Sequence, residues 1–361
     1  MADFTGSSNW TVSSSSIEKL VGKSIDTILN FSPLTLYFLG HQKKWSGSQM
    51  RFPIKYATNS QGMSFDGLEK FSTTKTNNFV YMTFNPTGRQ IPVVISQIEA
   101  DVNAAGRVVD VVARQMAADA QDMASDIATL FYTAQTSKNF LSILDGVDDS
   151  TNVTNYGGLS RSTYTGIQGN YTASIGNLTL ANMATDFNNS THGADSPNLL
   201  VCDKTVWNYY EALLTPTLSN QVVNNALLGY SSFLGASKNG LPNIAAPGSN
   251  LKGYQGFNAI FYRGVPMVAD EVAPSGNLFM LNTRTWGFYG LPSTDEGYKP
   301  VKFQSESLDS VYNLPVTTGF SWSGFQRPID QYGKVGHIVL LGNLICDNPR
   351  LNARMLGITG S

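Results

Sequence analysis

The chain has 361 residues, of which 42% are hydrophobic and 14% are charged, and its formal net charge is −2 at pH 7. A chain of this length buries enough apolar surface for one large domain or two moderate ones. Its lysines and arginines are scattered, which argues against sequence-specific DNA binding, because that function calls for a basic face. Low charge with many uncharged polar residues suits extensive protein–protein contact, since charged residues are depleted at interface cores.

The sequence also predicts a cytosolic protein without a membrane segment. No apolar run approaches the ~18 residues of a membrane span. The first residues, MADFTGSSNW, lack the basic and apolar regions of a signal peptide. Cys202 and Cys346 each lie in an apolar run, which indicates buried free thiols in a reducing compartment.

The first 95 residues predict a short helix followed by a long exposed hairpin. The helix covers residues 16–30, and Pro33 prevents its continuation. Residues 50–56 alternate apolar and polar side chains, and residues 79–84 are rich in β-forming residues. A two-stranded hairpin has too little core to persist alone, so we expect its apolar side chains to pack on a neighbouring subunit. The predicted intersubunit contacts are Phe65, Leu68, Phe71, Phe79, Tyr81 and Phe84.

Residues 96–132 predict a single long helix of ~50 Å, at 1.5 Å per residue. From Ile98 onward, apolar residues recur every three or four positions, and no proline interrupts them. No second helix of similar length is evident, so we expect this apolar stripe to pack on a sheet, with Asp119 and Asp122 exposed or at an interface. The core positions predicted along the helix are Val109, Val112, Met116, Met123 and Ile127.

The second half of the chain predicts a polar connection, a mixed α/β region and a return to β-structure. The connection, residues 145–177, is long for a loop within one compact unit, which favours a crossing between domains. Residues 335–348 have the pattern of a long buried strand. In the α/β region we expect helices at 178–187 and 204–214, and strands at 197–203, 257–262, 265–270 and 277–283.

The sequence contains no recognisable catalytic or metal-binding pattern. His41, His192 and His337 lie far apart and lack metal-ligand spacing. There is no phosphate loop and no nucleophile elbow. Asp145 and its acidic neighbours, Asp148 and Asp149, are not in register with the Gly and the late Glu of a calcium loop, which favours a solvated acidic turn. We therefore expect no catalytic residues, no metal and no cofactor.

Three stretches carry a family resemblance: GLSRSTYTGIQ at 158–168, GVPMVADEVAPSGNLFMLNTRTWGF at 264–288 and GNLICDNPRLNARMLGI at 342–358. They resemble, in turn, the Arg-Ser-Thr-Tyr crossing, the Gly-Val-Pro strand with its Pro-x-Gly turn, and the closing Gly-Asn-Leu-x-Cys-x-Asn-Pro-Arg run of major capsid proteins with the Hong Kong 97-type fold. These are the shell proteins of tailed bacteriophages. The likeness covers nearly the whole chain, and the order of predicted elements agrees with it.

The resemblance implies an α+β fold of the Hong Kong 97 type. By position it implies an N-terminal arm at 1–49 and an extended β-hairpin loop at 50–95. A peripheral domain with a long spine helix would occupy 96–155 and be completed by 300–361. The α/β axial domain would occupy 156–299. In this family a loop lysine can be crosslinked to an asparagine of a neighbour, but nothing in the sequence pairs the loop lysines with Asn343, Asn348 or Asn352.

The implied function is structural, without enzymatic activity. Copies of the chain would form hexamers and pentamers of an icosahedral shell around a double-stranded DNA genome, made in the bacterial host cytoplasm and carried in the virion. A portal protein and decoration proteins would be partners. A separate scaffolding protein would be needed, because the hairpin begins close to the start of the chain. Contact with packaged DNA would be non-specific, since a lining rich in Lys and Arg would hold the DNA too tightly.

Two alternatives remain open from the sequence. An encapsulin-type shell would share the fold and hold enzymes in place of DNA, although the Arg-Ser-Thr-Tyr crossing favours the phage family. A secreted β-rich carbohydrate-binding protein would suit the composition rich in Asn, Ser, Thr and Gly. The missing signal peptide, the absence of a paired-carboxylate motif and the long helix count against that second alternative.

Overall fold

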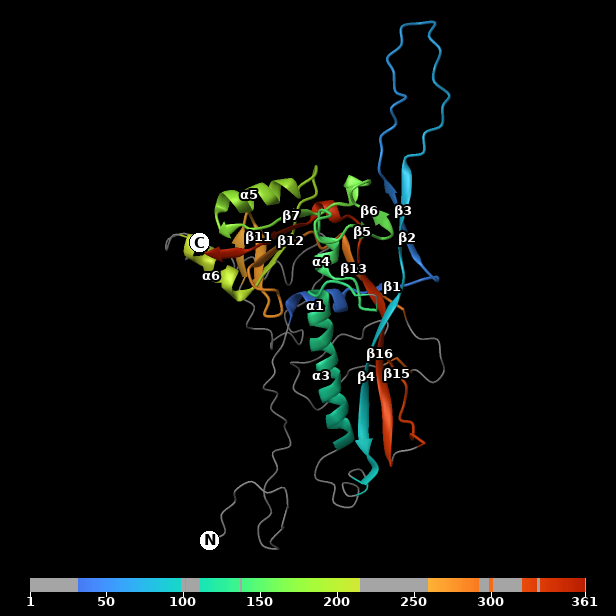
Figure 1. Ribbon diagram of the computed structural model, residues 1–361, viewed down its shortest axis with the longest axis vertical. Coiled ribbons are helices and arrows are strands. Elements are labelled where there is room, and N and C mark those ends of the chain that lie inside the picture. Colours follow the sequence, from blue (N-terminus) through green and yellow to red (C-terminus); the bar gives the residue numbers. More distant parts are fainter. Residues whose placement is uncertain are drawn as a thin grey trace.

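The computed structural model describes residues 32–98, 101, 111–136, 138–214, 259–291, 299–300, 320–329 and 332–360. Two six-stranded sheets organise this part of the chain, and a long hairpin projects away from them (Figure 1). Helices and mixed sheets together make an α+β fold, as the sequence predicted. The predicted helix at 16–30 lies outside the described residues.

The first sheet is built around one long strand, β16 (Gly333–Cys346). Its first half pairs antiparallel with β4 (Thr87–Ser96), from Gly333 opposite Ser96 to Gly342 opposite Thr87. Its second half pairs with β13 (Trp286–Gly290). The sheet is completed by β1 (Lys43–Lys44), β15 (Phe320–Trp322) and β14 (Lys299–Pro300). The long strand predicted at 335–348 is therefore confirmed.

The second sheet has the order β10-β11-β9-β12-β17-β7. These strands are β10 (Ala259–Tyr262), β11 (Val265–Ala269), β9 (Leu199–Cys202), β12 (Asn277–Leu281), β17 (Ala353–Leu356) and β7 (Asn170–Thr172). Every residue of β9 and β12 is buried, as expected for strands covered on both faces. Alternate residues along β9 and β12 enter two different hydrophobic cores, so this sheet separates the cores.

One core lies between the second sheet and the helices α5 (Leu180–Asn189) and α6 (Lys204–Leu213). Thr179 caps α5 by accepting from the amide of Asn182, and Asp203 caps α6 in the same way. Both helices, the strand β9 between them and the strands β10, β11 and β12 after them lie within about two residues of the predicted ranges. The other core is larger and joins the second sheet to the first sheet and to α1 (Pro33–Gly40) and α3 (Val111–Phe131).

Short elements complete the described chain. They are α4 (Ile143–Gly146), the single 3-10 turns at Thr165–Ile167 and Pro349–Leu351, the ribbon of β5 (Asn155–Tyr156) with β6 (Leu159–Ser160), and the ribbon of β8 (Gly176–Asn177) with β18 (Ile358–Gly360). Pro33 is the first residue of α1, with Ser32 as its cap. Proline is favoured at that position because its missing N–H would have no helical partner there.

The predicted helix at 96–132 overlaps the preceding strand by one residue, because Ser96 ends β4 while Gln97, Ile98 and Asp101 are helical. Ile98 is helical as predicted, but it is exposed, whereas the predicted apolar stripe needed it buried. The strand extends to Ser96 because β16 supplies a backbone partner for every residue of β4, which an isolated helical pattern does not reveal. Residues 102–110, including Val109, lie outside the described residues.

Helix α3 packs against β4 and brings its apolar stripe into the larger core. Met123 and Ile127 are fully buried there, and Asp122 on the same helix is exposed. The side chains of Val112 and Met116 lie outside what the structure describes. Asp126 joins the helix to the sheet, because the guanidinium of Arg89 in β4 donates to both of its carboxylate oxygens, at 2.5 and 2.9 Å.

A buried carboxylate connects three distant parts of the chain. Asp270, which follows β11, accepts hydrogen bonds from the hydroxyl of Ser32 at 2.5 Å and from that of Tyr132 at 2.9 Å. Ser32 begins α1, and Tyr132 follows α3. The start of α1 and the end of α3 are thus both fixed to the residue that follows β11.

Asp186 in α5 gives a prediction for stability against pH. Its side chain is buried, Thr172 donates to Oδ1, and Oδ2 has no hydrogen-bond partner. Burial raises the pKa of this carboxyl above its ordinary value. A raised folded-state pKa favours folding at low pH, and this contribution is lost as the pH rises through the folded-state pKa. We therefore compare the free energy of unfolding of Asp186→Asn with that of the parent, by urea unfolding at pH 7 and near pH 4. The difference, variant minus parent, is expected to be more positive at pH 7 than near pH 4. A variant-minus-parent difference that becomes more positive toward low pH would contradict this prediction.

Candidate assembly surfaces

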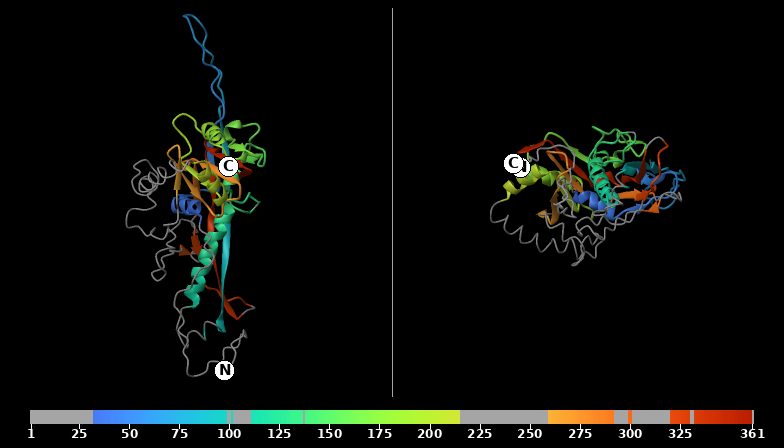
Figure 2. Two further views of the ribbon diagram at one scale, coloured as in Figure 1. Left: turned by 90° about the vertical axis from the view of Figure 1, so that its left-hand side faces the viewer. Right: turned by 90° about the horizontal axis from the view of Figure 1, so that it is seen from below.

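The projecting hairpin consists of β2 (Met50–Lys55), β3 (Phe79–Phe84) and the connecting residues 56–78. The two strands pair antiparallel, from Met50 opposite Phe84 to Lys55 opposite Phe79. Figure 1 and the left view of Figure 2 show the connecting residues extending well beyond the two sheets. The hairpin ends at Phe84, earlier than the predicted residue 95, because β4 belongs to the first sheet.

The two faces of the hairpin differ in burial. On the inner face, Met82 and Phe84 are buried and Phe52 is half-buried. On the outer face, Phe79 and Tyr81 are 56% and 58% exposed. Near the tip, Phe65 and Phe71 pack edge-to-face on each other and stay mostly exposed, and Leu68 is fully exposed. Large apolar side chains grouped in this way are typical of interaction sites on soluble proteins.

The structure corrects one of the predicted intersubunit contacts. Phe84 is 3% exposed and belongs to the core of its own subunit, so it is not free to contact a neighbour. Side chains alternate between the two faces of a strand, so Phe84 lies opposite in orientation to Phe79 and Tyr81. Counting positions along residues 79–84 would have found this in the sequence. The other five predicted side chains, Phe65, Leu68, Phe71, Phe79 and Tyr81, are exposed.

Aromatic contacts join the base of the hairpin to the body. The ring of Phe84 lies 5.9 Å from that of Phe52 and 5.2 Å from that of Tyr156, between centroids. Phe52 also contacts Tyr289 of β13 at 5.8 Å. Further along the hairpin, Tyr56 packs edge-to-face on Tyr164 at 5.3 Å. Edge-to-face pairs contribute about 0.5–1.5 kcal/mol beyond area burial, so the base is held firmly while the tip is free.

This difference between base and tip predicts opposite results for two alanine variants. Phe84→Ala removes a buried ring, and we expect a loss of about 3–5 kcal/mol in the free energy of unfolding. Phe79→Ala removes an exposed ring from the same strand, and we expect unfolding to change by less than about 0.5 kcal/mol while association weakens. Urea unfolding of the unassembled subunit measures the stability change of each variant, and sedimentation velocity measures association. Equal losses of stability would contradict the assignment of the two faces.

A second group of exposed apolar side chains lies at the opposite end of the first sheet. Val94 and Ile98 lie at and just after the end of β4, and Ile329 and Tyr332 lie in the connection from β15 to β16. The amide of Gln97 donates to the carbonyl of Tyr332 at 3.3 Å, which brings these two segments together. All four side chains are more than half exposed. We call this group the lower patch.

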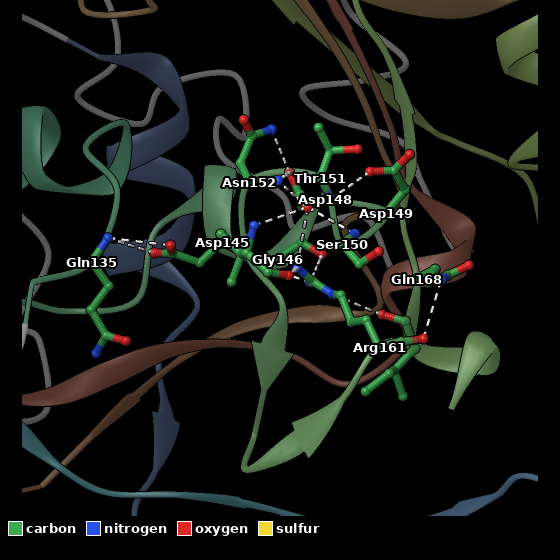
Figure 3. A network of polar contacts seen from close by, with 12 residues as sticks. Gln135, Asp145, Gly146, Asp148, Asp149, Ser150, Thr151, Asn152, Arg161 and Gln168 are labelled. Atoms are coloured by element: carbon green, nitrogen blue, oxygen red, sulfur yellow. Dashed lines mark hydrogen bonds and ion pairs between the residues drawn. The ribbon is translucent and has the colours of Figure 1, made fainter. Parts of the chain in front are cut away.

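The acidic turn has a structural explanation. Asp148 is buried, and its carboxylate accepts from the backbone amides of Ser150, Asn152 and Val153 (Figure 3). The carboxylate of Asp145 forms a capping box with Ser142 at the start of α4, and Asp149 accepts from the amide of Thr151. The turn is thus largely buried rather than solvated, and its carboxylates are occupied by local backbone donors.

The remaining polar candidates are also engaged in the fold. Among the described residues, no group of three or more His, Cys, Asp or Glu side chains could hold a metal ion. Cys202 and Cys346 are free and buried, as predicted, and burial raises the pKa of the Cys346 thiol to about 12. Asn343 and Asn352 are buried and hydrogen-bonded within the subunit, which makes them unavailable to a neighbour's lysine. No described helix is both long and apolar enough to cross a membrane.

Comparison with solved structures identifies the fold. The chain is similar to the capsid protein of cyanophage A-1(L), with a TM-score of 0.63 at 14% identity, over 95% of this chain and 97% of that one. It is also similar to the capsid of a native GTA particle, with a TM-score of 0.58 at 8% identity, over 95% and 96% of the two chains. The SrpI encapsulin of Synechococcus elongatus PCC 7942 matches with a TM-score of 0.52 at 11% identity, over 95% and 92%.

These likenesses extend along nearly the full length of both chains, so they concern the whole architecture rather than one shared motif. The described chain therefore has the Hong Kong 97-type fold that the sequence predicted. No protein-family model and no curated protein sequence matches the chain. At identities of 14% or less, the solved structures show the fold alone.

Proposed function

We propose that this chain is a structural capsid protein, whose copies assemble into the icosahedral shell of a tailed bacteriophage around double-stranded DNA. The observation that carries the proposal is the projecting hairpin, on a chain with the fold of phage capsid proteins. Its outer face and tip expose large apolar side chains that its own subunit does not cover, among them Phe65, Leu68, Phe71, Phe79 and Tyr81. An isolated two-stranded ribbon is marginally stable, and another surface would stabilise it.

A second copy of the chain is the partner that best fits both exposed surfaces. The hairpin and the lower patch lie at opposite ends of the long axis of the described structure (Figure 1). Contacts between different surfaces of identical copies repeat around an axis, and they close into a ring where the rotation allows it. Hexamers and pentamers are such rings. A stable contact of this kind buries well over ~1,000 Å² in total, which a hairpin of this length can supply.

The proposed domains follow the same arrangement. The N-terminal arm is 1–49. Of the extended loop at 50–95, only residues 50–84 form the projecting hairpin, and β4 belongs to the first sheet. The peripheral domain contains α3 and is completed by the strands after residue 300. The axial domain, 156–299, contains most of the second sheet with α5 and α6. Strand β17 supports this division only in part, because it lies in the C-terminal segment yet pairs with β12.

The remaining partners follow from the proposed role. A separate scaffolding protein would guide curvature, and a portal protein would occupy one vertex. Decoration proteins would bind the outer surface. Packaged DNA would contact the shell without sequence specificity, consistent with a net charge of −2. The protein would be made in the host cytoplasm and carried in the virion, in a structural role without catalysis or cofactors.

Assembly of the purified chain tests the proposal. We expect sedimentation velocity and electron microscopy to show closed or malformed icosahedral shells, with or without a coexpressed scaffolding protein. A chain that stays monomeric at high concentration under both conditions would contradict a shell-forming function. The contents then separate the two kinds of shell that share this fold. A phage capsid protein yields shells that package DNA with its own terminase and portal, whereas an encapsulin-type shell would hold a protein cargo.

A further inference from the structure

A buried arginine lies beneath the base of the hairpin. Arg161 is 0% exposed, and its guanidinium donates to four backbone carbonyls (Figure 3). Nη2 donates to Asp145 at 2.6 Å and to Gly146 at 3.0 Å. Nη1 donates to the carbonyl of Val153 at 3.1 Å, and Nε to that of Ile167 at 3.3 Å. One side chain thus fixes three separate turns of the chain between residues 145 and 167.

The charge of Arg161 is poorly compensated by acidic groups. The carboxylate of Asp148 lies 3.9 Å from Nη1, and backbone amides already occupy that carboxylate. Burial lowers the pKa of Arg161 from its ordinary value. A buried charge of this kind is weak evidence for added stability, because desolvation opposes the gain. The planar guanidinium does fix geometry, since it holds several acceptors in set directions that a lysine ammonium cannot reproduce.

The turns held by Arg161 support the hairpin directly. The guanidinium carbon lies 5.0 Å from the ring centroid of Tyr156, and that ring packs on Phe84. The hydroxyl of Tyr156 also accepts from the amide of Cys346 at 2.9 Å, which fixes the position of the far end of the ring. These contacts form a continuous path from the buried charge to the inner face of β3.

The backbone makes a second connection at the next residue. The amide of Thr83 in β3 donates to the carbonyl of Gly157 at 2.8 Å. Gly157 has a φ of +56°, and a Cβ there would lie 2.7 Å from Cβ of Met82. Only glycine allows this close approach. The hairpin therefore leaves the body at a point set by Tyr156 and Gly157, both of which belong to the turns that Arg161 holds.

We propose that Arg161 is a positioning residue for assembly, which fixes the direction in which the hairpin leaves the subunit. Through Tyr156 and Gly157 it sets where the exposed side chains Phe79 and Tyr81 meet the neighbouring copy. The positional part depends on this subunit alone. The part concerning the neighbour rests on the proposed shell function.

Hydrogen exchange of the unassembled subunit tests the positional part. We expect Arg161→Lys, which keeps the charge and loses the planar fork, to speed exchange of the Thr83 amide by about tenfold or more. Amides of β12 in the second sheet serve as an internal reference and should keep their rates. Unchanged exchange at Thr83 in a folded Arg161→Lys subunit would overturn the proposal. Equal acceleration at Thr83 and in β12 would also overturn it, since this would indicate general destabilisation.

Arg354→Lys is the matched control. Arg354 is also a buried arginine, but it lies in β17, where Nε donates to Asn277 and the guanidinium packs on Tyr171 and Phe279. We expect this variant to leave Thr83 exchange unchanged. If Arg161→Lys does not fold, Tyr156→Phe tests the proposal instead, because it keeps the aromatic ring and loses the hydrogen bond to Cys346. It should speed Thr83 exchange, and unchanged exchange would overturn the path through Tyr156.

Assembly measurements test the part that concerns the neighbour. We expect Arg161→Lys to give fewer closed shells and more aberrant particles than Arg354→Lys under identical conditions, by electron microscopy. Shells as numerous and regular as those of the control would overturn this part. If the parent chain itself forms no shells, the proposed function fails, while the exchange result at Thr83 still decides whether Arg161 positions the hairpin.

Discussion

Replacing residues 63–75 by a short Gly-Ser turn is expected to leave a folded subunit that no longer forms shells. The replaced segment contains Phe65, Leu68 and Phe71, none of which belongs to either hydrophobic core. The turn would retain Tyr56, whose hydroxyl donates to the carbonyl of Asn77 at 2.9 Å. Asp66 and Glu69 are removed together with Lys70 and Lys75, so the net charge does not change. Any loss of assembly would then reflect lost contact rather than altered charge.

The size of the expected effect follows from the side chains removed. Burying one Phe or Leu contributes about 1.5–3 kcal/mol to association. The tip carries three such side chains, and each 1.4 kcal/mol changes an association constant by about tenfold. Loss of the tip is therefore expected to lower the association constant of each contact by several orders of magnitude. Because every subunit of the proposed shell would make this contact, the effect should be close to complete loss of assembly.

Circular dichroism with sedimentation velocity measures fold and assembly together. A matched variant keeps the length of the loop and replaces Phe65, Leu68 and Phe71 by serine, which separates the apolar contact from the reach of the hairpin. We expect both variants to have the parent's spectrum and to sediment as small species. An unfolded deletion variant would mean that the tip belongs to its own subunit's core. Assembly equal to the parent's would mean that the tip makes no intersubunit contact.

Local periodicity predicted the elements that depend on neighbouring residues. The strand at β16, the helices α5 and α6 and the inner face of β2 follow from patterns of two and of three to four residues. The helix predicted from residue 96 overlaps β4 by one residue, Ser96, because strand pairing decides that boundary. β4 extends to Ser96 only because β16 lies opposite, more than two hundred residues away in sequence. Such long-range pairing is not contained in local preference.

The candidate surface was predicted in composition but not in orientation. The apolar content of residues 65–84 indicated an interface, yet Phe84 needed the alternation of the strand to be assigned to the core. Arg161 illustrates a different limit. An arginine in a polar connection is ordinarily expected to be exposed. Its burial depends on four carbonyls from separate turns, which come together only in the folded chain. The sequence therefore singled out the Arg-Ser-Thr-Tyr stretch as a resemblance, without its physical role.

The second large effect concerns the core beneath α3, where Met123→Asp is expected to prevent stable folding. Met123 is 0% exposed and belongs to the larger hydrophobic core, so a carboxylate at this position would lie among apolar side chains. A buried carboxylate without a partner costs several kcal/mol. This is a large part of the 5–15 kcal/mol that stabilises a typical domain. We expect most of the variant to be insoluble, and any soluble fraction to unfold at a much lower temperature than the parent.

Two variants on the same helix isolate the cause. Thr129→Asp adds the same charge at an exposed position, and we expect a change within about 0.5 kcal/mol. Met123→Leu keeps an apolar side chain of similar volume and should cost less than about 1.5 kcal/mol. Thermal unfolding followed by circular dichroism compares all three. A soluble Met123→Asp variant with the parent's melting temperature would show that this face of α3 is not buried in the core.

The pH dependence of Met123→Asp then identifies desolvation as the mechanism. Burial would raise the folded-state pKa of the new carboxyl above its value of about 3.9 in the unfolded chain. The folded state would therefore bind a proton more tightly, and stability relative to the parent would be recovered as the pH falls toward ~4 and lost as the pH rises through the folded-state pKa. Thr129→Asp, being exposed, should show no such recovery. A deficit in Met123→Asp that is independent of pH would point to steric misfit in place of a buried charge.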